Sequence, residues 1–144
     1  MISQMKTMQS DPLTGRIISC CFKVHSALGP GFPEKLYSAA LMRSLQDSQL
    51  FVETEKRFTV VFEGNSVGVF RVDVLVEDRV ILEVKAITGA MPKIFSAQLL
   101  AYLKAANKPV GLLVNFGNSS CQVKRTVFSS VKSIVKSAES IHAH

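Results

Sequence analysis

Two neighbouring apolar segments of the sequence each carry an acidic residue at a position where a buried strand would be expected to be apolar. Asp73 lies within residues 67–76, and Glu83 lies within residues 80–86, two positions before Lys85. Residues two apart on a strand share a face, so Glu83 and Lys85 are expected on the same side. Two carboxylates and an ammonium group on adjacent strands can hold a divalent cation and offset the charge of a phosphate.

Whether Asp73 meets Glu83 depends on the loop between the two segments. A two-residue turn would place the two carboxylates on opposite faces of the sheet. A three-residue loop over residues 77–79 places Asp73 directly opposite Glu83, and it requires Asp78 or Arg79 to accept a positive φ. We predict the three-residue loop, because it brings the polar side chains together.

Opposed carboxylates are costly unless something neutralises them. Cross-strand partners have Cβ atoms about 5 Å apart. At an effective dielectric near 20, two bare carboxylates in a partly dry site repel by roughly 3 to 4 kcal/mol. A divalent cation reverses that sign, and oxygen ligands with room for water favour Mg²⁺ or Mn²⁺ over zinc. The spacing alone is equally compatible with an ion pair between Lys85 and Asp73 or Glu83 on a wet sheet face.

Two helices are expected before these strands. Asp11-Pro12 is typical of a helix start, with a side-chain cap followed by proline at the first helical position. Gly29-Pro30-Gly31 must end that helix, because it combines free φ angles with a blocked N–H. Pro33 can open a second helix. Its apolar side would comprise Leu36, Tyr37, Ala40, Leu41 and Leu45.

Extended segments and further helices follow. Strands are predicted over residues 58–62, 67–76, 80–86, 110–116 and 121–127. A helix over 91–106 separates the third and fourth strands, and another is expected near 129–137. This order indicates a mixed β-sheet flanked by helices, in the α/β or α+β class. We expect one domain over residues 11–128, after a flexible segment (1–10) and before a C-terminal helix and tail (129–144).

The bulk properties narrow the partners. The chain has 144 residues and a net charge of +6, which favours a polyanionic partner, although no run of basic residues exceeds two. No apolar stretch is long enough for a membrane span, and the first ten residues lack the apolar core of a signal peptide. The cysteines, Cys20, Cys21 and Cys121, show no metal-ligand spacing, so free thiols and a cytoplasmic location are expected.

Several motifs together resemble a known family. Asp73 with Glu83-Val84-Lys85 resembles the Asp…(Asp/Glu)-x-Lys signature of the PD-(D/E)XK nuclease superfamily, whose core is restriction-endonuclease-like. Gly31-x-x-Glu34-x-x-Tyr37 is a complete GxxExxY motif, and Gln98-x-x-x-Tyr102 and the segment 111–117 follow. The whole, over residues 12 to 127, resembles the GxxExxY protein family, a branch of that superfamily. The first motif departs from the signature in having no proline before Asp73.

The resemblance implies a role for each matching position. Asp73, Glu83 and the backbone carbonyl of Val84 would hold Mg²⁺ or Mn²⁺, and Glu34 would bind it directly or through water. Lys85 would orient or deprotonate the attacking water and offset charge on the phosphate. Gln98 and Tyr102, on one face of a helix, would line the site.

Taken individually, some of these residues have simpler explanations. Glu34 could be an acid that stabilises a helix start, and Tyr37 a structural tyrosine. Gln98 and Tyr102 could close the core. A histidine among apolar positions, His25, is usually a hydrogen-bonded core residue. Asn115, before Gly117, is explained by turn chemistry.

The sequence therefore predicts a metal-dependent nuclease that hydrolyses phosphodiester bonds, in DNA rather than RNA. The alternatives are a non-catalytic nucleic-acid-binding module and an accessory protein that is active only with a partner. By analogy with the fold, a homodimer is expected.

Overall fold

The computed structural model describes residues 11–129. Its elements are α2 (Pro12–Leu28), α3 (Glu34–Asp47), β1 (Val52–Phe62), β2 (Asn65–Val76), β3 (Val80–Lys85), α4 (Lys93–Ala106), β4 (Val110–Asn115) and β5 (Gln122–Val127). The segment predicted to be flexible (1–10) and nearly all of the predicted C-terminal helix and tail lie outside the described residues.

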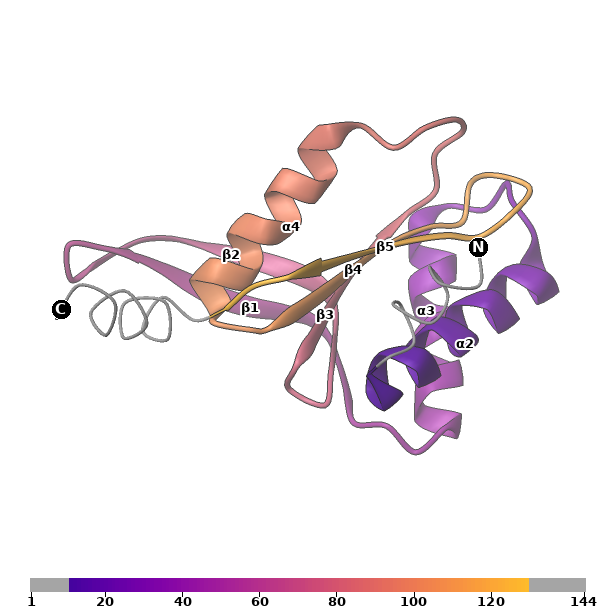
Figure 1. Cartoon of the computed structure of the whole chain (residues 1–144), viewed down its shortest axis with the longest axis horizontal. Helices are drawn as coiled ribbons and strands as arrows, with labels where there is room; N and C mark the ends of the chain where they lie inside the picture. The colour runs from indigo at the N-terminus through magenta and orange to yellow at the C-terminus, as the bar shows by residue number, and fades with distance from the viewer. Residues whose placement is uncertain (1–10, 130–144) are drawn as a thin grey trace, which may run out of the picture.

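The five strands form one mixed sheet in the order β1-β2-β3-β4-β5. All neighbours are antiparallel except β3 and β4, which are parallel and are connected through α4. Helices α2 and α3 cover one face and α4 covers the other (Figure 1). Strand β4 is buried along its whole length, as expected for a strand with helices on both faces. The predicted mixed sheet flanked by helices is confirmed.

The two N-terminal helices begin and end where their sequence requires. Asp11 caps α2 by accepting a hydrogen bond from the Leu13 N–H at 3.0 Å. Gly29 ends the helix with a φ of 67°, a conformation that glycine adopts without steric cost. The buried face of α3 consists of three residues spaced four positions apart, Tyr37, Leu41 and Leu45. Leu36, which we predicted on this side, is 49% exposed, because it lies about 100° around the helix from Tyr37.

Tyr37 explains part of the Gly-x-x-Glu-x-x-Tyr motif in structural terms. Its ring is fully buried and stacks on Phe116, with the centroids 4.7 Å apart. Its hydroxyl donates to the carbonyl of Gly29 and accepts from the N–H of Phe32. One side chain thus fixes the turn between α2 and α3 against the sheet, and this turn sets where Glu34 begins α3.

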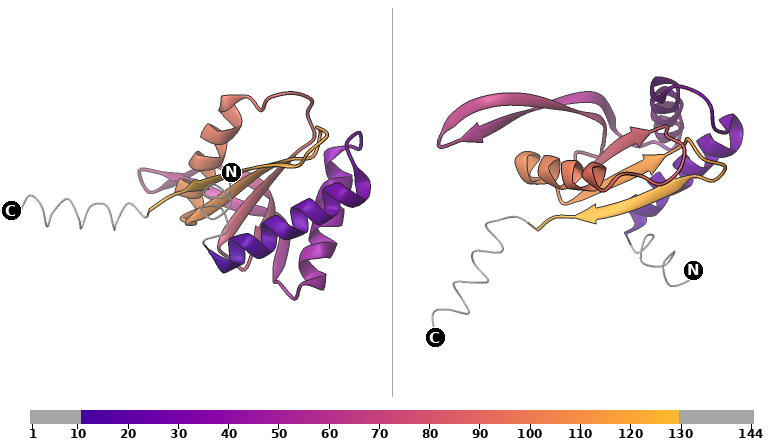
Figure 2. Two further views of the ribbon diagram at one scale, coloured as in Figure 1. Left: turned by 45° about the vertical axis from the view of Figure 1, so that its right-hand side comes forward. Right: turned by 90° about the horizontal axis from the view of Figure 1, so that it is seen from above.

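The hairpin of β1 and β2 is longer than predicted. Strand β1 begins at Val52 rather than at residue 58, because its first half is an edge strand rich in charged residues and carries little apolar signal. Strand β2 pairs with β3 only through residues 74–76, so residues 65–72 pair with β1 alone. Residues 56–72, here called the ribbon, therefore reach out from the sheet past α4 (Figures 1 and 2).

The three cysteines are free, as predicted. Burial raises the pKa of the Cys21 thiol well above its ordinary value and that of Cys121 to about 12. Thiols in this state are poor nucleophiles, so we assign them no chemistry. Among the helices of residues 11–129, none is long and apolar enough to cross a membrane.

Candidate active site

The register of the β2–β3 hairpin places Asp73 opposite Glu83. Val76 pairs with Val80 and Val74 with Leu82, so the loop has three residues, as predicted. The turn differs in detail. Positive φ angles occur at Glu77 and Asp78, and Arg79 does not have one. Glu77 tolerates this conformation because its N–H donates to the carbonyl of Phe51 and its carboxylate accepts from the Phe51 N–H.

The backbone ladder between β2 and β3 stops at this acidic pair. Beyond Val74 and Leu82 no further residues of the two strands pair. Instead, the N–H of Asp73 donates to the Glu83 carboxylate at 2.9 Å, and the N–H of Val84 donates to the Asp73 carboxylate at 2.7 Å. The two acidic side chains therefore converge between diverging strands, as a shared site requires.

This convergence raises the pKa values of two side chains. Glu83 is 6% exposed. Burial, and then the neighbouring charge of Asp73, raise the pKa of Glu83 from an ordinary 4.5 to about 8, against a smaller opposing effect of Lys85. Burial also raises the pKa of Tyr102, and the charges of Glu83 and Asp73 raise it further. The hydroxyl of Tyr102 thus lies within the field of the acidic pair.

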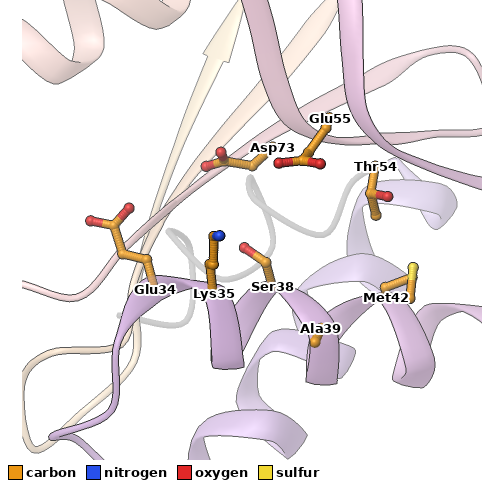
Figure 3. A pocket seen from close by; sticks show the side chains of 8 residues that line it. All are labelled: Glu34, Lys35, Ser38, Ala39, Met42, Thr54, Glu55 and Asp73. Carbon is orange, nitrogen blue, oxygen red and sulfur yellow. The ribbon is translucent and has the colours of Figure 1, made fainter.

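A cavity of about 520 Å³ opens beside Asp73, between α3 and the β1–β2 hairpin. It is lined by Glu34, Lys35, Ser38, Ala39, Met42, Thr54, Glu55 and Asp73. Figure 3 shows the carboxylates of Glu34, Glu55 and Asp73 directed into this space, with Lys35 rising from α3 between them. Within residues 11–129, no three acidic, histidine or cysteine side chains are close enough to enclose a metal ion, so Glu34 does not join the pair as a third close carboxylate.

Glu55 is a site residue that the sequence-based prediction missed. It lies opposite Asp73, because its neighbours Thr54 and Lys56 pair with Val74 and Val72. Its φ of 51° interrupts β1 at this point, which brings both Thr54 and Glu55 to the cavity wall. No signal in the residue types pointed to it, since the relevant half of β1 was not predicted as a strand.

The remaining predicted residues differ in where they lie. Lys85 shares a face with Glu83, and its ammonium nitrogen is 4.4 Å from the centroid of the Phe95 ring, on the first turn of α4. Tyr102 stacks on Phe70 with centroids 4.3 Å apart. Gln98 is exposed on α4, and its side chain makes no hydrogen bond with another residue in 11–129. The structure thus brings together Asp73, Glu83, Lys85 and Tyr102, places Glu34 across the cavity, and leaves Gln98 outside the contacts.

A comparison with protein families decides the assignment. A sequence model of the PD-(D/E)XK nuclease superfamily matches residues 11–126, which is most of the chain. The chain belongs to this superfamily. A comparison with curated protein sequences found no match.

Solved structures are similar to this chain in fold. The crystal structure of SSO0001 is similar with a TM-score of 0.54 and 18% identity, over 76% of this chain and 58% of that one. An alkaline exonuclease from Laribacter hongkongensis, LHK-Exo, gives a TM-score of 0.48 and 13% identity, over 74% and 60% of the two chains. This chain spans about 60% of either structure, and its likeness to SSO0001 is one of fold alone.

In this member of the superfamily, an amide network holds the loop that follows Lys85. The buried Asn115 accepts from the N–H of Ile87 and donates to its carbonyl, at 2.9 and 3.0 Å. Asn118 does the same for Gly89, at 2.8 and 2.9 Å. Both amides also donate to the Gln122 side chain. We call Asn115, Asn118 and Gln122 the amide clamp.

The clamp requires a glycine beside it. A Cβ on Gly117 would lie 2.2 Å from the Ile87 carbonyl oxygen, so the loop can cross this strand end only over a residue without a side chain. The turn interpretation of Asn115 is therefore incomplete. Asn115 and Gly117 together fix the loop between Lys85 and α4. They thereby fix the place of Phe95, on the first turn of α4, beside the lysine.

Proposed function

We propose that this chain is a metal-dependent nuclease of the GxxExxY branch, which hydrolyses phosphodiester bonds of DNA by attack of a water molecule. The observation that carries the proposal is the convergence of Asp73 and Glu83 where β2 leaves β3, next to an open cavity. Superfamily membership supports the class of reaction. The net charge of +6 supports a polyanionic substrate.

The donor set fits a hard divalent cation. Burial and then the neighbouring carboxylate of Asp73 raise the pKa of Glu83 to about 8, so positive charge would stabilise the ionised site. Oxygen ligands without cysteine or histidine favour Mg²⁺ or Mn²⁺. Asp73, Glu83 and the backbone carbonyl of Val84 would hold it, with Glu34 acting across the cavity through water. Such an ion lowers the pKa of bound water and offsets charge on the phosphate.

The other side chains have distinct roles in the proposal. Lys85 presents its ammonium group to the scissile phosphate and the attacking water, and the Phe95 ring confines it. Tyr102, within the field of both carboxylates, directs its hydroxyl toward the reacting groups. Gln98, which is exposed, would contact the substrate only when the substrate lies along α4.

The test is a cleavage assay on single-stranded, duplex and branched DNA and on RNA, with Mg²⁺, Mn²⁺ or EDTA. Wild type is compared with Asp73→Asn, Lys85→Ala and the control Lys104→Ala, an exposed lysine on α4. We expect wild type and the control to cleave with Mg²⁺ or Mn²⁺ but not in EDTA. The two site variants should not cleave under any of these conditions. Equal cleavage by all four proteins would identify a contaminant and overturn the proposal.

A second candidate is a nucleic-acid-binding or accessory module that is inactive alone, for which a homodimer or a protein partner would complete the assembly. One observation favours it: each carboxylate already accepts a backbone N–H, so the pair has a structural use without a metal. Salt-dependent DNA binding by wild type with no turnover in either metal, and no uptake of Mn²⁺ by calorimetry in the presence of DNA, would support this candidate.

The location proposed for the protein is the cytoplasm. The reason is chemical: Cys20, Cys21 and Cys121 are all free thiols, a state that a reducing compartment maintains. Formation of a disulfide on mild oxidation of the folded protein would argue against it.

A further inference from the structure

Two arginines lie directly opposite each other on the ribbon. Arg57 of β1 and Arg71 of β2 are Cα partners in the antiparallel pairing, so their side chains leave the same face of the ribbon. Directly opposed like charges destabilise a two-stranded ribbon. Such a pair is expected where a negatively charged partner compensates for the repulsion.

The chain itself supplies little compensation. Arg71 approaches the carboxylate of Glu55 at 3.8 Å, but both side chains are more than half exposed, and such pairs contribute little. Arg57 forms no ion pair with any residue in 11–129. Lys35, which lines the cavity below, likewise has no ion-pair partner among those residues.

The arginine pair faces the same side as the cavity. Val72 and Phe70 belong to the core that packs on α4, so Arg71 between them points to the opposite face. Glu55, which Arg71 approaches, lines the cavity together with Asp73. Arg71 is two residues from Asp73, about 7 Å along an extended strand. The pair therefore stands at the outer rim of the cavity, one strand repeat from the acidic site.

We propose that Arg57 and Arg71 together bind the backbone phosphate next to the one that is hydrolysed, so that one DNA strand runs from the cavity along the ribbon. This inference rests on the proposed function and adds the path of the substrate. Two guanidinium forks on one face match the oxygens of a phosphate, and they bind it without reading a base. Lys35 extends the row of positive charge into the cavity.

The experiment compares Arg57→Gln/Arg71→Gln with wild type and with Lys23→Gln/Lys104→Gln, a control that removes two positive charges away from the cavity. Binding of a fluorescein-labelled DNA strand and its duplex is measured by anisotropy over a range of KCl, in proteins that also carry Asp73→Asn to prevent turnover. Cleavage kinetics are measured with Asp73 intact. Circular dichroism verifies the fold of each variant.

We expect the arginine variant to raise KM and Kd about tenfold while kcat changes less than about twofold, because the pair binds substrate outside the reacting bond. For each phosphate that the variant no longer neutralises, the slope of log K against log salt should fall by about 0.7 on a single strand, or about 0.9 on a duplex. Arg57→Lys/Arg71→Lys should keep the slope and recover only part of the affinity. The lysine control should match wild type.

The outcomes separate the two proposals. Cleavage by wild type with unchanged KM and salt slope in the arginine variant would overturn the inference and leave the nuclease proposal standing. Loss of DNA binding in the arginine variant, with no cleavage by wild type in any metal, would support binding of a DNA phosphate by the arginine pair but overturn the nuclease proposal, and with it the place of that phosphate next to a hydrolysed one. An equal loss of binding in the lysine control would also overturn the inference, because it would show an effect of net charge alone.

Discussion

Along both edges of β3, backbone groups lie beyond the end of the β-ladder and need other hydrogen-bond partners. Different side chains supply these partners on the two edges. On the β2 side, the ladder stops and the carboxylates of Asp73 and Glu83 accept the backbone N–H groups that would otherwise be left unpaired. On the β4 side, beyond Lys85, the ladder also stops. There the side-chain amides of Asn115 and Asn118 pair with the loop backbone.

The difference lies in what each side chain can do. An amide both donates and accepts, so Asn115 satisfies the N–H and the C=O of Ile87 and leaves no net charge. A carboxylate only accepts, and two of them in a buried place repel each other. At the amide edge, the hydrogen bonds are therefore satisfied without any net charge. At the carboxylate edge, the negative charges are balanced only when a cation or a proton is bound. We therefore assign the first edge a structural role and propose the second as the place of the proposed chemistry.

Glu83→Gln should show the largest effect, a loss of activity without a loss of stability. The amide still accepts the N–H of Asp73, but it brings no charge to a metal. We expect cleavage to fall by more than about 100-fold, the loss that changes around metal ligands commonly reach. The free energy of unfolding without metal should stay the same or increase, because a buried repulsion is removed. Cleavage assays and urea unfolding check the two halves, and parallel loss of both would contradict the comparison.

The pH dependence of stability should follow Glu83. Its pKa is about 8 in the folded protein and near 4.5 when unfolded, so the folded state holds the proton more tightly. The contribution of Glu83 to stability is therefore fully present below about pH 4.5 and is lost as the pH rises to about 8, a loss on the order of 4 kcal/mol for metal-free protein. Urea unfolding between these pH values measures it.

Two controls bear on this pH effect. Glu83→Gln should flatten the pH profile, whereas Asn115→Ala should leave its slope unchanged. Mn²⁺ should bind more tightly as pH rises toward 8, because protons compete with the metal for the same carboxylate. A wild-type profile that is already flat would show that the acidic pair is less coupled than the geometry indicates.

At the amide edge, substitution should affect stability more than chemistry. Asn115→Ala removes four hydrogen bonds and leaves partly buried partners unpaired, so we expect a loss of about 3 kcal/mol in the free energy of unfolding. Asn118→Ala, whose partner Gly89 is exposed, should cost about 1 kcal/mol. Cleavage per folded molecule should fall only modestly in both. Unchanged stability in Asn115→Ala would refute the structural assignment of this edge.

The sequence predicted one edge of β3 well and the other poorly. Asp73 and Glu83 stand out because charges in apolar strands have few explanations, and the loop length follows from the need to bring them together. Asn115 does not stand out, because an asparagine before a glycine is ordinary turn chemistry. Two of its three partners, Ile87 and Gly117, offer only backbone atoms, which leave no trace in residue types.

The helices and the central strands were predictable for the same reason, since burial imposes periodicity on residue types. The first half of β1 was missed because an exposed edge strand need not alternate. That omission concealed Glu55, whose place depends on the β1–β2 register. The exposed position of Gln98 on α4 could not be predicted either, because helical spacing does not show which face of a helix meets the sheet. Contacts that depend on register or on backbone atoms lie beyond what the residue pattern contains.

The smallest expected effect concerns Phe95, which lies between the amide clamp and Lys85. The amide clamp fixes the loop that leads into α4, whose first turn carries Phe95, and the ammonium nitrogen of Lys85 is 4.4 Å from the centroid of the Phe95 ring. A cation–π contact of this kind contributes about 1 kcal/mol when partly exposed. Phe95→Leu should therefore lower kcat about fivefold with little change in KM, whereas Phe95→Tyr, which keeps the ring, should retain activity. If Phe95→Leu and Phe95→Tyr reduce kcat equally, the ring serves only to fill space, and the clamp influences the site through packing rather than through the position of the lysine.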